Sequence, residues 1–117
     1  MLLRVDPASP VPLFEQIAAS VRFDVSRGTV RVGDRLPAAR GIAESLDINV
    51  HTVLRAYQLL RDEGLVDLRP GRGAVITPKA ADYTELGEAI PRLVAQARQL
   101  DLSLAALTAM IRSEYNS

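Results

Sequence analysis

The stretch LPAARGIAESLDINVHTVLRAYQLLRDEGLVDLRPGRGAVI, residues 36–76, decides the fold of this chain. Leu36-Pro37 opens a helix over residues 38–46, and the three residues that follow leave room only for a sharp turn. Asn49 is a typical N-cap residue, because its side-chain oxygen can accept from the free amides of the next turn. A second helix is therefore predicted from Asn49 to about Glu63.

Two short β-prone runs, 65–69 and 74–77, complete this stretch around Pro70-Gly71-Arg72-Gly73. They predict a hairpin with an exposed basic tip, because Gly and Pro favour tight turns. Helix, turn, helix and basic hairpin in this order are typical of a winged helix, which presents its second helix to the major groove of DNA. The predicted fold class is therefore mainly α with a small β-hairpin.

Before this stretch, the chain predicts an extended segment and one amphipathic helix. Pro7, Pro10 and Pro12 disfavour helix before about position 12, and Pro12 then suits a first helical turn. Apolar residues then recur at spacings of three and four up to Gly28, which suits a helix end. This inward stripe consists of Phe14, Ile17, Ala18, Val21 and Val25.

After Pro78 the pattern changes to two C-terminal helices with one apolar stripe, so we divide the chain into a winged domain, 1–79, and a dimerisation region, 80–117. Spacings of four and three predict a helix that packs along a seam. Either this helix starts near Ala89 with Pro91 in its first turn, or a longer helix is kinked at Pro91. Ser103 is the predicted cap of the last helix. The predicted seam residues are Leu86, Ile90, Leu93, Ala97, Leu100, Leu104, Leu107 and Ile111.

Composition excludes several classes of function. Of the 117 residues, 48% are hydrophobic and 24% charged, as in folded proteins, and none is cysteine. Without cysteine, and with a single histidine, the chain offers no catalytic residues, no metal site and no cofactor motif. No apolar run approaches the roughly 20 residues that span a membrane, and the N-terminus does not resemble a signal peptide. We therefore expect a cytoplasmic protein that is not an enzyme.

The net charge of zero does not favour a DNA-binding function, since DNA affinity comes largely from neutralised phosphates. Its distribution is slightly more favourable. There are 11 Lys+Arg against 9 Asp+Glu through Lys79, and 3 against 5 after it. Placement of individual arginines therefore matters more than the total.

The predicted recognition helix carries polar residues at its start, where a winged helix meets DNA. His51 can donate to phosphate or guanine, Thr52 can contact a phosphate or a thymine methyl group, and Arg55 can reach either. The alternative is an ordinary solvated helix face.

Other candidate contacts lie outside this helix. Arg40 could bind a phosphate or pair with Glu44 four residues later. In the hairpin, Gly71 and Gly73 permit a tight tip, and Arg72 between them can enter the minor groove or touch the backbone.

Together these residues resemble the GntR-type bacterial transcription regulators, and among them the short YtrA-like subgroup. The resemblance implies a winged helix, a symmetric dimer and repression at a palindromic operator in double-stranded DNA. It also implies DNA contacts from Arg40, Asn49, His51 and Thr52, and from the wing residues Gly71, Arg72 and Gly73. It rests on PLFEQI (12–17), Gly28, GDRLPAAR (33–40), NVHTVLRAY (49–57), GLV (64–66) and GRG (71–73).

Two positions depart from the family pattern, because Val50 and Leu54 stand where basic residues are common. Base reading then shifts to His51 and Arg55, or affinity depends more on dimerisation and the wing. The subgroup resemblance implies that the C-terminal helices dimerise, although their apolar stripe could instead pack on the winged domain.

Two further possibilities stay open at this level. The near-neutral charge would also suit a winged-helix protein-interaction module without DNA affinity. A small-molecule effector of unknown identity is compatible with the sequence, but no residue pattern indicates one.

Overall fold

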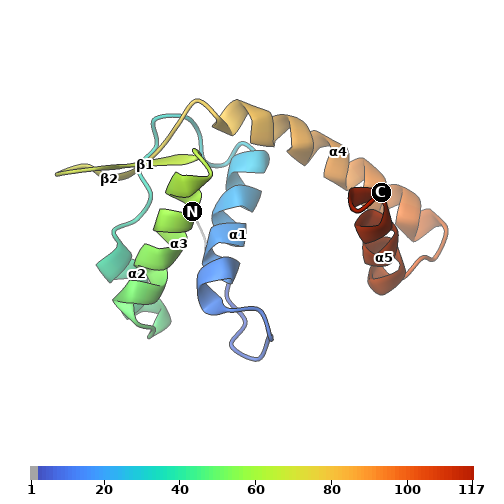
Figure 1. Cartoon of the computed structure of the whole chain (residues 1–117), viewed down its shortest axis with the longest axis horizontal. Coiled ribbons are helices and arrows are strands. Elements are labelled where there is room, and N and C mark those ends of the chain that lie inside the picture. The colour runs from blue at the N-terminus through green and yellow to red at the C-terminus, as the bar shows by residue number, and fades with distance from the viewer. Residues whose placement is uncertain (1–2) are drawn as a thin grey trace.

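The computed structural model describes residues 3–117 and shows a mainly helical protein with one antiparallel hairpin (Figure 1). This confirms the predicted winged helix-turn-helix followed by C-terminal helices. Met1 and Leu2, the start of the predicted extended segment, lie outside the described residues. The elements are α1 (Leu13–Ser26), α2 (Ala39–Leu46), α3 (Val50–Asp62), β1 (Val66–Arg69), β2 (Gly73–Ile76), α4 (Ala80–Gln99) and α5 (Leu104–Tyr115).

The sharp turn between α2 and α3 is closed by local hydrogen bonds. Asp47 adopts the left-handed conformation with φ of +55°, and the amide of Ile48 donates to the carbonyl of Ala43 at 3.0 Å. Asn49 Oδ1 then accepts from the amide of His51 at 2.8 Å. The predicted N-cap is thus confirmed, and it fixes where the recognition helix begins.

One side of α3 forms the centre of the core. Helix α1 packs against it, and the hairpin closes one end through Leu65, Val66 and Ile76, each at most 1% exposed. Four of the five predicted inward residues of α1 are confirmed as buried, namely Ile17, Ala18, Val21 and Val25, whereas Phe14 is only partly buried. The buried residues of α3 are Val53, Ala56, Tyr57 and Leu60, all at most 3% exposed.

The segment before α2 pairs with β2 and so supports the hairpin. The amide of Gly33 donates to Ile76 O at 2.9 Å, and the amide of Leu36 donates to Ala74 O at 2.8 Å. Arg35 lies opposite Val75 as an antiparallel bridge. The sequence predicts a short extended segment here, but the pairing with β2 appears only in the tertiary structure.

A buried tyrosine ties α3 to the start of α2. The hydroxyl of Tyr57 donates to the carbonyl of Pro37 at 2.6 Å, and the residue is 3% exposed. Burial disfavours the charged phenolate and raises the pKa of Tyr57 to about 12. The bond therefore holds the Pro37 segment, and with it the first turn of α2, against the recognition helix.

Helix α4 begins at Ala80 and continues through Pro91, so the alternative start near Ala89 is wrong. Figure 1 shows it as one gently curved helix that passes over the end of α1. The crossing depends on Gly87, where a Cβ atom would lie 2.7 Å from the carbonyl carbon of Ser26 and 2.8 Å from its Cβ. Only glycine permits this approach of α4 to the backbone of α1.

A polar group beside this crossing joins three elements. Arg22 of α1 forms a two-pronged ion pair with Glu63, at the end of α3, and Tyr83 of α4 donates to the same carboxylate at 3.4 Å. The hydrogen bond that Arg22 donates to the Glu63 carboxylate raises the pKa of Arg22, and burial raises the pKa of Tyr83. The winged domain thus fixes the direction in which α4 leaves it.

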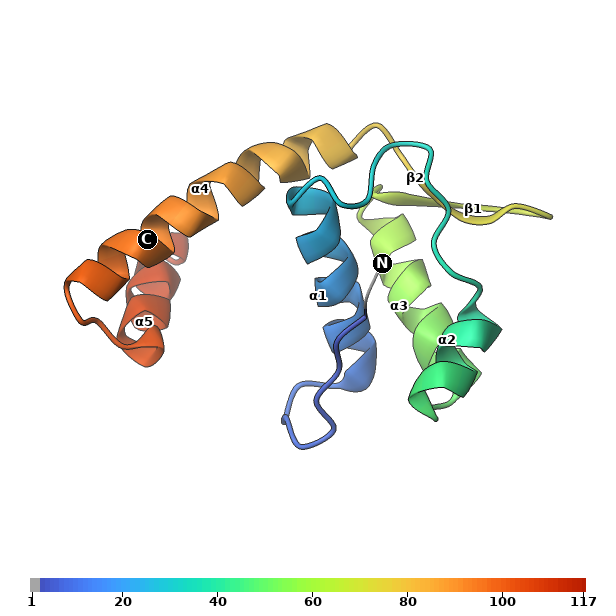
Figure 2. The same cartoon turned by 180° about the vertical axis from the view of Figure 1, so that it is seen from behind.

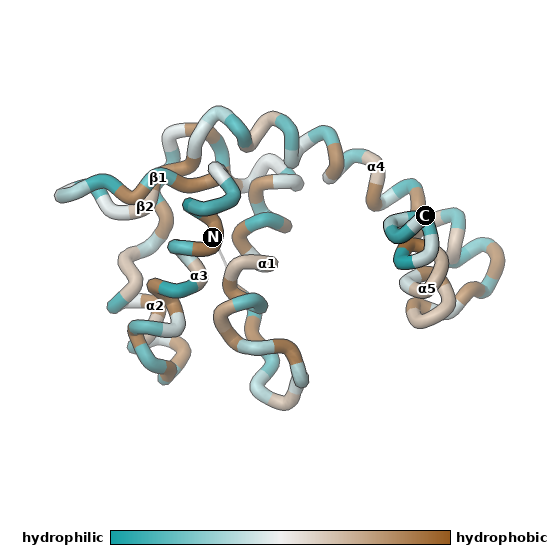
Figure 3. Tube along the Cα trace, in the orientation of Figure 1, coloured by the Kyte–Doolittle hydropathy of each residue, from teal (hydrophilic) through white to brown (hydrophobic). Residues whose placement is uncertain are grey.

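The outer half of α4 and α5 form a helical hairpin that stands apart from α1 in both views (Figures 1 and 2). Ala97 and Leu107, two of the predicted seam residues, are buried within the chain. The other six are 40–78% exposed, so the stripe does not pack on the winged domain. Figure 3 shows hydrophobic residues at the α4–α5 connection. None of the helices described here has the length and hydropathy of a membrane span.

We expect Gly87→Ala to lower the free energy of unfolding by about 1–3 kcal/mol, because the added methyl group overpacks a rigid backbone contact. Gly41→Ala is the matched control, since Gly41 is also helical but has nothing within 4 Å of its would-be Cβ. Urea unfolding followed by circular dichroism measures both. A Gly87→Ala protein as stable as the wild type would contradict the crossing.

We expect Tyr57→Phe to lower the free energy of unfolding by about 1 kcal/mol at neutral pH, because a buried carbonyl loses its donor. In the wild type the contribution of Tyr57 is complete below pH of about 10 and is lost as the pH rises through about 12, since its pKa is raised in the folded state. The difference between wild type and variant should therefore shrink in that interval. Tyr115 is 88% exposed, so Tyr115→Phe should change neither the free energy of unfolding at neutral pH nor its dependence on pH.

Candidate nucleic-acid interface

The N-terminus of α3 is the first part of the candidate site. His51 is exposed and Thr52 is half-buried, next to the Asn49 cap. Because Asn49 Oδ1 already accepts from the His51 amide, its amide nitrogen remains as a donor for a partner. The free backbone amides of this first turn also favour an anion such as a phosphate.

Arg40 lies in the first turn of α2 and is exposed. Among residues 3–117 it takes part in no ion pair, so the alternative pairing with Glu44 is not formed. Its guanidinium group therefore remains able to bind a phosphate. The Tyr57–Pro37 hydrogen bond holds this turn in place relative to α3.

The tip of the hairpin is a tight, glycine-dependent turn. Gly71 and Gly73 have φ of +76° and +73°, and the amide of Arg72 donates to Arg69 O at 3.0 Å. Such φ values favour glycine at both positions. Arg35 Nε donates to the carbonyl of Arg72 at 2.8 Å, so the side chain of one arginine positions the backbone of another.

An open groove of about 720 Å³ lies between α3 and the hairpin. Arg35, Arg69 and Arg72 line it, and no acidic side chain does. Arg69 also contacts Asp67 at 3.2 Å, but both side chains are about half exposed, so this pair is weak. The apolar part of the lining includes Leu36, Leu54, Tyr57 and Leu68.

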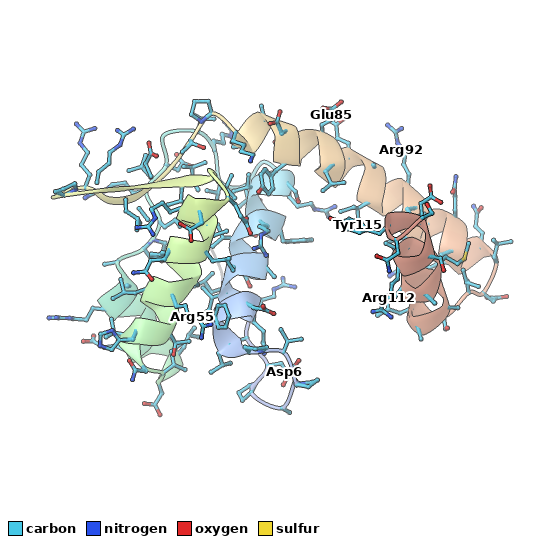
Figure 4. The ribbon with its side chains drawn as sticks, in the orientation of Figure 1. Asp6, Arg55, Glu85, Arg92, Arg112 and Tyr115 are labelled. Carbon is cyan, nitrogen blue, oxygen red and sulfur yellow. The ribbon has the colours of Figure 1, made fainter. Side chains whose placement is uncertain are left out.

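Arg55 differs from the other predicted contacts. Its guanidinium group lies over the ring of Phe14, 3.8 Å from the ring centroid, which is a cation–π contact between α3 and α1. Figure 4 shows Arg55 between these two helices, away from the hairpin. The structure thus places Arg55 apart from the groove.

The structure brings together most of the residues that the sequence singles out. Asn49, His51 and Thr52 lie at the turn between α2 and α3, Arg40 lies at the other end of α2, and Gly71, Arg72 and Gly73 form the hairpin tip beside the groove. Sequence reasoning missed Arg35, Arg69 and Leu68. Arg35 acts through a contact 37 residues away, for which the sequence holds no local signal.

Comparisons with known proteins agree with this geometry. Residues 13–76, more than half of the chain, match the gntR family of bacterial regulatory proteins. The HTH-type transcriptional repressor YtrA of Bacillus subtilis is 29% identical, over 95% of this chain and 90% of that protein. The HTH-type transcriptional regulator Rv1152 of Mycobacterium tuberculosis is 34% identical, over 86% of this chain and 84% of that regulator.

A solved structure extends the agreement to the fold. YtrA from Sulfolobus acidocaldarius, a GntR-family transcription factor, superposes with a TM-score of 0.62 at 30% identity, over 81% of this chain and 99% of that one. The family match covers α1, the helix-turn-helix and the hairpin, which together carry the candidate interface. This chain therefore belongs to the GntR family of bacterial regulators, which are DNA-binding transcription regulators and not enzymes.

Proposed function

We propose that this protein is a homodimeric, sequence-specific repressor that binds a palindromic operator and acts in the cytoplasm. The observation that supports this most is the surface formed by the N-terminus of α3, Arg40 and the hairpin tip. Beside the hairpin tip, the groove between α3 and the hairpin is lined by Arg35, Arg69 and Arg72 and by no acidic residue. The relative from Bacillus subtilis is named as a repressor, which favours repression here.

Each part of this surface has a distinct role in the proposal. His51 and Thr52 enter the major groove with the N-terminus of α3 and contact base edges, and the amide of Asn49 contacts the adjacent backbone. Arg40 binds a phosphate and so sets the register of the helix. Arg72, held by Arg35, reaches the backbone or the minor groove.

Arg55 has a smaller part in this proposal. To reach DNA, its guanidinium group would have to leave the Phe14 ring, where it is 3.8 Å from the centroid. The cation–π contact would be lost as the DNA contact formed, and this loss offsets part of the binding free energy that the DNA contact contributes.

The C-terminal region supplies the dimer. A second copy is the simplest partner for its exposed apolar residues, because a twofold axis covers the same stripe on both copies. The direction of α4 is fixed by the Gly87 crossing and by the Arg22–Glu63 pair. Two α3 helices held in this way would read half-sites about 34 Å apart, one turn of DNA. The stripe consists of Leu86, Ile90, Leu93, Leu100, Leu104 and Ile111.

We expect Arg40→Ala and Arg72→Ala each to weaken binding of the dimer to a palindromic duplex selected from a random pool by about a hundredfold, since each removes one charge-assisted hydrogen bond of roughly 1.5 kcal/mol from both protomers. Fluorescence anisotropy at several salt concentrations measures this. The slope of log affinity against log salt should fall by about 1.8 for each substitution, because the dimer loses two phosphate contacts, and by about 3.6 in the double variant. Arg92→Ala on α4 is the control and should bind like the wild type. An unchanged slope in the double variant would refute the assigned surface.

We expect Leu93→Glu to convert the dimer to monomer, because two buried carboxylates would face each other across the twofold axis. Ala95→Glu is the control, since Ala95 is exposed and lies about 200° further round α4 at 100° per residue. Sedimentation equilibrium gives the mass of each protein. The monomer should also bind one half-site as well as it binds the palindrome. A wild-type protein that is monomeric at tens of micromolar would rule out this interface.

A further inference from the structure

An exposed leucine stands in the middle of the proposed recognition surface. The side chain of Leu54 is 38% exposed, one turn after His51 and one turn before Gln58, both of which are exposed. It lines the groove towards the hairpin, where Leu68, also 38% exposed, lies in the same lining. The exposed part of Leu54 faces an open groove, so a ligand that enters this groove would contact it.

The chemistry of DNA restricts what this leucine can recognise. A leucine side chain neither donates nor accepts a hydrogen bond, so it cannot read the polar groups of guanine, adenine or cytosine. In the major groove, thymine alone presents an apolar group, the C5 methyl. An apolar side chain on a recognition helix therefore gains most beside a thymine.

The surroundings of Leu54 favour this placement. Arg35, Arg69 and Arg72 line the same groove and suit a negatively charged DNA strand between α3 and the hairpin. Leu54 lies on the α3 side of that groove, one helical turn after His51. The C5 methyl group of a thymine projects into the major groove near the backbone of its own strand, so a strand in this groove would bring such a methyl group within reach of Leu54.

We propose that Leu54 is a specificity-determining residue that recognises a thymine in each half-site through the C5 methyl group. This rests on the proposed function, since it requires that α3 enters the major groove. It also gives a role to a position where basic residues are common in the family. A basic side chain at this position would bind a phosphate or a guanine. Leu54 instead makes affinity depend on a single methyl group of the DNA.

Removal of that methyl group tests the proposal atom by atom. A palindromic duplex is first selected from a random pool with the wild-type protein. Each thymine of one half-site, with its symmetry mate, is then replaced by deoxyuridine, which differs only in lacking the C5 methyl. At one position we expect affinity to fall about fourfold per methyl lost, the effect of exposing one buried CH₂-sized group.

Variants of the protein complete the thermodynamic cycle. Leu54→Ala should bind the thymine and deoxyuridine duplexes equally, whereas Gln58→Ala, the control at the next exposed position, should keep the full preference. Because Leu54 is partly exposed, Leu54→Ala should also keep the thermal unfolding temperature of the wild type. When 5-methylcytosine replaces that thymine, the wild-type protein should bind the duplex more tightly than it binds the duplex with cytosine at that position. Leu54→Ala should bind these two duplexes equally.

The possible failures can be told apart. If the wild type selects no duplex, the proposed function is wrong and the role of Leu54 falls with it. If a palindrome is selected but no deoxyuridine changes affinity, or if Leu54→Ala keeps the same preference, the inference alone is wrong. Equal weakening of both duplexes by Leu54→Ala would show a backbone contact and would also overturn it.

Discussion

Burial of one side of α3 is the constraint on which the rest of the structure depends. Val53, Ala56, Tyr57 and Leu60 are at most 3% exposed, and α1, α2 and the hairpin are all placed by packing against this helix. Because a helix that buries one side leaves the opposite side to solvent, the same packing exposes His51, Leu54 and Gln58. One side of α3 thus forms the centre of the core, and its opposite side forms part of the candidate interface.

The second constraint is the direction of α4. At Gly87 the helix approaches the backbone of Ser26 more closely than any side chain would allow, and the carboxylate of Glu63 joins α1 and α4 beside it. In the proposed dimer, a C-terminal region anchored in this way would set the distance between the two α3 helices.

Local placement of arginine reconciles a net charge of zero with a nucleic-acid interface. Arg22 and Arg61 are paired with carboxylates at some distance from the groove, while Arg35 and Arg72 line it without such a partner among residues 3–117. Hydrogen bonds from Arg35 to the hairpin and from Tyr57 to Pro37 then hold the groove walls. The net charge of the chain is a poor guide to DNA binding here, because a DNA phosphate is attracted mainly by nearby cations while salt screens the distant charges.

The sequence by itself determined the order of the helices, the bounds of the first three to within a few residues, the Asn49 and Ser103 caps and most of the inward stripe of α1, because periodicity and capping are local properties. It also indicated most of the candidate DNA contacts, through a resemblance carried by short motifs. Only the tertiary structure decided that α4 runs through Pro91, that Ala97 and Leu107 are buried within the chain, and that Arg55 stacks on Phe14. The same holds for the Arg35 contact with the hairpin and the Gly87 crossing. The contacts of Arg55, Arg35 and Gly87 join residues far apart in the chain, and which distant residues meet depends on how the elements pack, which no local pattern records.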